Sequence, residues 1–174
     1  MITVVAALSL ALAGGPATRD YSCLTNGQWL TGDAEVVWEQ RAGDCLPEDL
    51  RRLAEGVSTI SLTRWSWASY SLTLRRDGSV VYDGFCGAAR LGCHRGRLEA
   101  WRFDRLARLV TEIGYFGLDG SYESDATDQQ IVVMAVSQFG CVKAVMDYGA
   151  VGPPRLWALE ELVSAALDDV EWMD

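Results

Sequence analysis

The stretch YSLTLRRDGSVVYDG, residues 70–84, constrains the fold of this 174-residue chain more than any other segment. Tyr70, Leu72 and Leu74 alternate with polar residues, which is typical of a strand with one buried face. The Asp-Gly pair at 77–78 favours a tight hairpin turn, and the apolar run SVVYDG follows it directly. The segment therefore predicts two antiparallel strands joined by a short turn.

Three further segments show the pattern of strands. Ile60 and Leu62 alternate with polar residues shortly before the hairpin. Residues 131–138 (IVVMAVSQ) and 141–148 (CVKAVMDY) are apolar runs that meet at a second turn. We expect all three segments to join the hairpin in one sheet.

Two segments show the helical period instead. Gly114 is placed to end the first helix, and Pro153-Pro154 opens the second. Their apolar stripes consist of Phe103, Leu106, Leu109, Val110 and Ile113, and of Leu156, Leu159, Leu162, Val163, Ala166 and Val170. The order of elements predicts an α+β fold, with a mainly antiparallel sheet and two helices packed on one face.

The first thirteen residues, MITVVAALSLALA, resemble a secretory signal peptide. No charged residue occurs before Arg19, and Ala11-Leu12-Ala13 has the small-x-small pattern that precedes a cleavage site. The apolar run is well short of the roughly 20 residues that a membrane-spanning helix needs. We therefore expect no membrane span and an exported protein, periplasmic or secreted. A buried strand or helix is the alternative.

The chain divides into three parts on these grounds. Residues 1–13 are the signal-like segment, residues 14–56 an N-terminal segment, and residues 57–174 the α+β domain. Within the second part, LPEDLRRLAEG predicts a short helix, because Pro47 suits a first helical turn and Gly56 a helix end.

Charge and motifs exclude several classes of function. A net charge of −9 argues against binding to nucleic acid or to an anionic membrane, because phosphate groups would repel most of this surface. The sequence has no Gly-x-Ser-x-Gly elbow, no His-Glu-x-x-His and no phosphate-binding glycine loop. We expect no cofactor and assign no catalytic residue.

Five cysteines in an exported protein form disulfides by default, and an odd number leaves one over. Spacing favours Cys23 with Cys45 and Cys86 with Cys93 as the disulfide candidates. Cys141 would then be a free thiol that packs as a small hydrophobe.

The segment GFCGAARLGCHRGR, residues 84–97, allows two competing chemistries. Cys86, Cys93, His94 and Cys141 could form a zinc site, but six residues between the first two cysteines is a wider gap than zinc-binding pairs usually have. A Cys–His nucleophile would need an orienting third group, and no motif supplies one. A hairpin bridged by a disulfide is the favoured interpretation, with no metal site.

Aromatic and acidic residues supply a candidate binding surface. Trp65 and Trp67 lie at a bend after the first strand and, with Tyr70, could form an aromatic platform for a glycan or a protein. Alternatively, these rings cap the core. Asp125 and Asp128 complete the surface from an acidic loop that lacks the regular alternation of a calcium site. Asp128 also suits an Asx-type turn.

Five motifs occur in a characteristic order over residues 58–173. They are ISLTR, YSLTLRRDGSVVYDG, FDRLARLVTEIGYFGL, the Thr127-Asp128 step before a strand, and PRLWALEELVSAALDDVEW. In this order the chain resembles a bacterial family of domains of unknown function found in exported proteins and lipoproteins. The resemblance implies the fold and export, and it supplies no activity and no site residues. This family tends to carry a close cysteine pair after its first strand, where this chain has WSWASY.

These observations favour a non-catalytic exported domain that binds an envelope protein or a glycan. One alternative is a small hydrolase-like enzyme that uses the loop carboxylates or His94, and a second is a metal-binding accessory protein. The carboxylate pairs Glu160-Glu161 and Asp168-Asp169 are interpreted as the solvent face of the last helix, because adjacent residues on a helix point in different directions.

Overall fold

The computed structural model describes residues 50–173. The signal-like residues 1–13, the rest of the N-terminal segment up to residue 49, and both Cys23 and Cys45 lie outside the described residues. The helices are α3 (Leu50–Gly56), α4 (Ala100–Glu112) and α5 (Pro154–Ala165), with short 3₁₀ turns at Tyr115–Gly117 and Ala166–Asp169. The strands are β1 (Val57–Trp65), β2 (Tyr70–Arg75), β3 (Ser79–Gly84), β4 (Gly92–Arg97), β5 (Ser121–Glu123), β6 (Ile131–Gln138), β7 (Cys141–Tyr148) and β8 (Glu171–Trp172).

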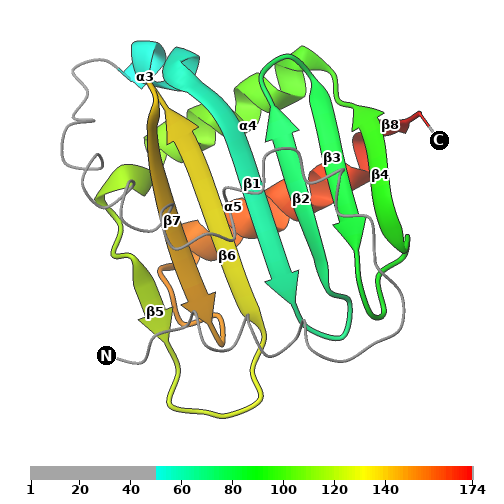
Figure 1. Cartoon of the computed structure of the whole chain (residues 1–174). Coiled ribbons are helices and arrows are strands. Elements are labelled where there is room, and N and C mark those ends of the chain that lie inside the picture. Colours follow the sequence, from blue (N-terminus) through cyan, green and yellow to red (C-terminus); the bar gives the residue numbers. More distant parts are fainter. Residues whose placement is uncertain (1–49, 174) are drawn as a thin grey trace.

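The strands form one sheet in the order β5-β7-β6-β1-β2-β3-β4-β8 (Figure 1). Neighbouring strands are antiparallel except for the short β5, which runs parallel to β7. The predicted α+β class with a mainly antiparallel sheet is therefore confirmed. The strand β5 lies inside the acidic segment before β6, which was expected to be a loop throughout.

The β2–β3 hairpin forms where the sequence predicts it. The Asp77 carboxylate accepts a 2.8 Å hydrogen bond from the backbone N–H of Ser79, and Gly78 adopts a positive φ of 82°. An added Cβ at Gly78 would also lie 2.8 Å from the carbonyl oxygen of Leu98. Glycine at this turn position is thus required by both backbone conformation and space.

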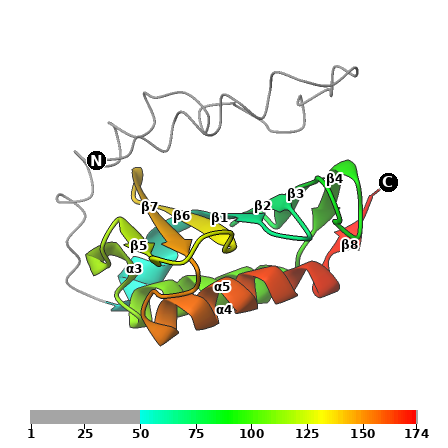
Figure 2. The same ribbon diagram turned by 90° about the horizontal axis from the view of Figure 1, so that it is seen from below.

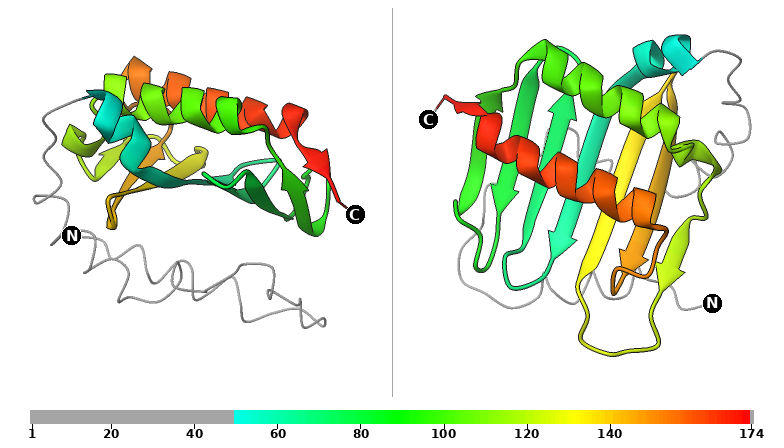
Figure 3. Two further views of the ribbon diagram at one scale, coloured as in Figure 1. Left: turned by 90° about the horizontal axis from the view of Figure 1, so that it is seen from above. Right: turned by 180° about the vertical axis from the view of Figure 1, so that it is seen from behind.

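Helices α4 and α5 run across the same face of the sheet, as Figure 2 and Figure 3 show from two sides. Helix α4 ends as predicted, with Gly114 in the left-handed conformation just beyond it. Helix α3 lies at one end of the sheet and contacts α4 (Figure 1). None of the helices within residues 50–173 is long and apolar enough to cross a bilayer.

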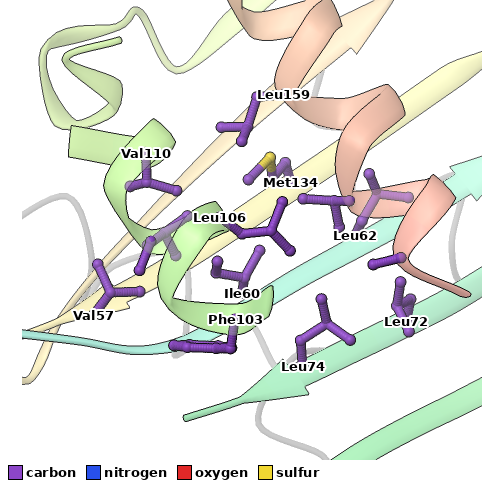
Figure 4. Close-up of a cluster of buried hydrophobic side chains, with 14 of the residues drawn as sticks. Val57, Ile60, Leu62, Leu72, Leu74, Phe103, Leu106, Val110, Met134 and Leu159 are labelled. Atoms are coloured by element: carbon purple, nitrogen blue, oxygen red, sulfur yellow. The ribbon is translucent and has the colours of Figure 1, made fainter. Parts of the chain in front are cut away.

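The core fills the space between the sheet and these helices. Alternate strand residues point toward the helices and meet their apolar stripes (Figure 4). The side chains labelled there are Val57, Ile60, Leu62, Leu72, Leu74, Phe103, Leu106, Val110, Met134 and Leu159. Leu162 is an exception to the predicted stripe of α5, since 44% of it is exposed.

Candidate binding surface at one end of the sheet

Two connections meet at the end of the sheet opposite α3. Trp65, the last residue of β1, pairs with Ile131, the first residue of β6. The turn after β1 and the loop before β6 are therefore neighbours (Figure 1). They line a shallow depression, which we call the Trp67 depression. Its lining residues are Ser66, Trp67, Asp128, Gln129 and Gln130.

The turn that carries Trp67 is held by hydrogen bonds at both of its ends. Ser69 Oγ donates to the Ser66 carbonyl at 2.8 Å, which closes the turn. The backbone N–H of Ser69 donates to the Cys86 carbonyl at 3.0 Å, and the N–H of Phe85 donates to the Ser69 carbonyl at 2.8 Å. The Trp67 side chain extends from this fixed turn with 97% of its surface exposed.

The opposite wall of the depression comes from the loop between β5 and β6. Asp128 adopts a φ of 59°, a left-handed conformation that aspartate tolerates better than most residues. Gln129 is held from two sides, because its N–H donates to the Tyr148 hydroxyl at 3.3 Å and its side-chain amide donates to the Thr127 carbonyl at 3.1 Å. The loop thus presents a carboxylate and two amides beside the indole.

The structure brings Trp67 and Asp128 together, as a shared surface requires. Trp65 is 36% exposed at the end of β1, on the face of the sheet turned away from the helices. Asp125 is exposed in the same loop as Asp128 but does not line the depression. The alternative that all these rings cap the core is wrong for Trp67, because its ring is almost wholly in solvent.

Tyr70 does not belong to this surface, and its assignment to it is corrected. It is only 9% exposed, and its hydroxyl donates to Ser164 of α5 at 2.9 Å. The reason is its register, since Tyr70 shares the inward face of β2 with Leu72 and Leu74.

His94 lies far from the acidic loop, in an aromatic cluster at the other side of the sheet. Its ring contacts the rings of Tyr82 and Trp172, with centroids 6.3 and 6.2 Å apart, and Nε2 lies 3.1 Å from the Leu91 carbonyl oxygen. Three strands separate β4 from β6, where the acidic loop enters the sheet. The arrangement therefore does not join His94 and the loop carboxylates in one site.

The cysteines differ from the spacing-based assignment. Cys86 is a free, exposed thiol, so it forms no bridge to Cys93. The β3–β4 register explains this: Asp83, and not Cys86, lies opposite Cys93, and Cys86 lies beyond the strand end in the loop that holds the Trp67 turn. Cys93 and Cys141 are both disulfide-bonded, which corrects the expectation that Cys141 is free.

The carboxyl of Glu160 on α5 is buried, which corrects its assignment to the solvent face of the last helix. Glu160 is 1% exposed and faces the sheet, whereas Glu161 takes the outward position. Burial and the nearby Asp147 carboxylate raise the pKa of Glu160 to about 8, and the Arg64 guanidinium opposes this shift. The sequence does indicate this buried position. Glu160 lies four residues after Leu156 and three before Val163, and residues at these spacings share one face of a helix.

The described residues 50–173 contain no assembled set of metal ligands. In that part of the chain no three side chains of His, Cys, Asp or Glu come together in a way that could hold a metal ion.

Comparison with known proteins identifies the family of the chain. A model of the family DUF6438, a domain of unknown function, matches residues 68–167. The chain belongs to this family. The DUF6438 match includes the loop with Asp128 and begins one residue after Trp67. No curated protein and no solved structure matches the chain.

Proposed function

We propose that this DUF6438 protein is a non-catalytic, exported binding domain of the bacterial envelope, and that it binds a glycan in the Trp67 depression. One observation carries the proposal: an indole that is 97% exposed stands on a hydrogen-bonded turn beside Asp128, Gln129 and Gln130. The signal-like start supports export, and the cysteines are consistent with an oxidising compartment.

The chemistry of the depression suits a sugar ring. An exposed indole offers a large, rigid apolar face, and burial of such a face against the C–H face of a sugar is favourable by roughly 25 cal/mol per Å². The Asp128 carboxylate accepts hydrogen bonds from hydroxyl groups, and the amides of Gln129 and Gln130 both donate and accept them. Stacking with several short polar contacts therefore fits a saccharide better than a purely apolar ligand.

The mechanism of binding requires little movement of the backbone. The Ser66–Ser69 and Ser69–Cys86 hydrogen bonds fix the turn that carries the indole, and the bonds of Gln129 fix the facing loop. A site held in place before the ligand arrives loses less conformational entropy on binding. We therefore expect the ligand to immobilise mainly the side chains of Trp67, Asp128 and Gln130.

Titration with soluble oligosaccharides tests the proposal. The purified mature protein would be titrated by calorimetry with chitotetraose, cellotetraose and a soluble peptidoglycan fragment. We expect weak binding, in the micromolar to millimolar range, to at least one of them. Trp67→Ala should abolish the heat, and Asp128→Asn should weaken binding about tenfold. Trp157→Ala is the matched control, because this half-exposed indole lies on α5, outside the depression.

Three outcomes would separate the alternatives. Equal affinity in the wild type and Trp67→Ala would overturn the site. Binding of an envelope protein that is lost in Trp67→Ala, with no saccharide bound, would keep the surface and replace the glycan by a protein. Turnover of a saccharide, rather than binding alone, would overturn the non-catalytic assignment.

A further inference from the structure

Asp128 is the one charged residue among the described residues that line the Trp67 depression. The other lining residues are Ser66, Trp67, Gln129 and Gln130, whose side chains are neutral. Asp128 is exposed, and no ion pair within residues 50–173 involves it. Its carboxylate is therefore available to a ligand that stacks on the indole.

The connection that carries Asp128 is acidic along its whole length. Residues 119–130 contain four acidic residues and neither lysine nor arginine, and the Trp67 turn, residues 65–69, contains no charged residue. The four acidic residues, all exposed, are Asp119, Glu123, Asp125 and Asp128. The electrostatic potential around the depression is thus negative, in line with the net charge of −9.

The basic residue closest in the sequence to Trp67 does not neutralise this charge. Arg64 lies three residues before Trp67, but its guanidinium donates to the carboxylate of Glu161 on α5 at 2.6 Å. Its side chain is half-buried between the sheet and that helix. The positive charge of Arg64 is therefore held by α5 and is not the counter-ion of Asp128.

We propose that the Trp67 depression selects oligosaccharides whose sugar rings carry a free, protonated amine. This inference rests on the proposed function and names the class of glycan that binds at the same site. The face of an indole attracts a cation, and the Asp128 carboxylate accepts a charge-assisted hydrogen bond from an ammonium group. An amino sugar satisfies both partners at once, because its C–H face stacks on the indole while its ammonium group pairs with the carboxylate.

The same charges discriminate against other glycans. An N-acetylated amino sugar is neutral, so it keeps the stacking on the indole and loses the attraction between its nitrogen and Asp128. A sugar acid or a sugar phosphate brings a negative charge to the carboxylates of residues 119–130 and is repelled. The expected order of affinity is therefore free amine, then neutral sugar, then acidic sugar.

Trp67 and Asp128 have separate tasks in this scheme. The indole contributes to the binding of every sugar ring, whereas the carboxylate distinguishes rings by their charge. Specificity is a difference between two affinities. The ratio of the affinities for a charged and a neutral sugar therefore reports the role of Asp128 more directly than either affinity alone.

Calorimetric titration of the purified mature protein with two tetrasaccharides measures this ratio. Chitotetraose and the glucosamine tetramer differ only in the acetyl groups on nitrogen, and at about pH 6 the free amines are protonated. We expect the glucosamine tetramer to bind the wild type about tenfold more tightly than chitotetraose. In Asp128→Asn this ratio should fall to about twofold or less, because only the indole still attracts the amine.

Asp125→Asn is the matched control. It removes the same charge from the same loop, but Asp125 does not line the depression. This variant should keep the affinity ratio of the wild type. An equal fall of the ratio in both variants would show that the general negative field of the loop attracts the amines, and it would overturn the assignment to the depression.

Tetralysine separates the charge of the ligand from its sugar rings. It carries side-chain ammonium groups and no ring that could stack on the indole. We expect it to bind more weakly than the glucosamine tetramer, with the same affinity for the wild type and for Trp67→Ala. If tetralysine binds as tightly and its binding is lost in Trp67→Ala, the depression recognises cationic peptides and the proposal fails.

The remaining outcomes separate this inference from the proposed function. Equal affinity of the wild type for the two tetrasaccharides, with both lost in Trp67→Ala, would overturn the selection of amines and leave the glycan site in place. The absence of binding to any saccharide would overturn both.

Discussion

The Arg64 guanidinium donates to the carboxylate of Glu161 at 2.6 Å and not to Glu160, its buried neighbour in the sequence. Within residues 50–173, Oε1 of Glu160 has no hydrogen-bond partner. Burial and the Asp147 carboxylate both disfavour the charged form, and the pKa of Glu160 rises to about 8. Glu160 is therefore protonated near neutral pH.

The first prediction concerns stability against pH. The folded-state pKa of Glu160, about 8, lies above its ordinary value of 4.5, so folding binds a proton between these two values. The contribution of Glu160 to the free energy of unfolding is thus favourable below about pH 4.5 and is lost as the pH rises through 8. Glu160→Gln, which is neutral at every pH, should be more stable than the wild type at pH 9 by a few kcal/mol.

Urea unfolding of both proteins at pH 5, 7 and 9 measures this difference. Glu161→Gln is the matched control, because the Glu161 side chain is 41% exposed and its ion pair contributes about 1 kcal/mol or less. The control should keep the pH dependence of the wild type. Parallel pH profiles for the wild type and Glu160→Gln would contradict the prediction.

Local signals made the central fold predictable. The Asp77-Gly78 turn and the alternation of β2 placed the hairpin, and Gly114 placed the end of α4. The same alternation places Tyr70 inside. Tyr70 was assigned to the surface because Trp65 and Trp67 lie close to it in the sequence, but the alternation of β2 decides its position.

Long-range pairing accounts for what the sequence did not reveal. In the short β5, Ser121 and Glu123 are exposed and only Tyr122 is half-buried. The strand exists because the Gly120 carbonyl accepts from the N–H of Met146 at 3.0 Å and the N–H of Ser124 donates to the Tyr148 carbonyl at 3.1 Å. No periodicity within three residues can predict such a parallel pairing. The Trp67 depression likewise depends on the β1–β6 register, which joins segments more than sixty residues apart.

The second prediction concerns the contact between α3 and the β6–β7 hairpin. A Cβ at Gly56 would lie 2.3 Å from Cζ of Phe139, so Gly56→Ala must push this ring aside. We expect a loss of about 1 kcal/mol or less in the free energy of unfolding, because the Phe139 ring is 56% exposed and can turn aside. Gly117→Ala is the control, because a Cβ there meets nothing within 4 Å.

A double-mutant cycle with Phe139→Ala identifies the cause. If the ring is what Gly56→Ala displaces, the two substitutions together should cost less than the sum of the single ones. Additive costs, or equal effects of Gly56→Ala and Gly117→Ala, would refute the contact.

The third prediction concerns Arg76, which joins three elements. Its Nε donates to the Val57 carbonyl at 2.6 Å, its guanidinium also donates to the Ala54 carbonyl, and it pairs with Asp104 at 2.8 Å. Arg76→Met keeps the stem and removes these donors, and should cost about 2–3 kcal/mol. Asp104→Ala removes only an exposed ion pair and should cost less than about 1 kcal/mol. Chemical denaturation measures the free energy of unfolding of both variants. An equal loss in the two would show that the ion pair with Asp104, and not the hydrogen bonds to the backbone carbonyls, supplies the stability.

The fourth prediction compares two glycines that share a backbone conformation. Gly87 and Gly92 have φ values of 72° and 85°, so alanine is strained at either position by about 1 kcal/mol. A Cβ at Gly87 would also lie 1.8 Å from the carbonyl oxygen of Trp67, whereas a Cβ at Gly92 meets nothing within 4 Å.

Gly87→Ala should therefore lower the melting temperature more than Gly92→Ala, and it alone should displace the turn that carries Trp67. Fluorescence quenching by acrylamide and, where a saccharide binds, calorimetric titration would report the displacement. Equal melting temperatures for the two variants would mean that the turn carrying Trp67 can move without a loss of stability. In that case the indole would not be held in advance for its ligand, because the hydrogen bonds of Ser69 with Cys86 and Phe85 would not fix the turn against the β3–β4 loop.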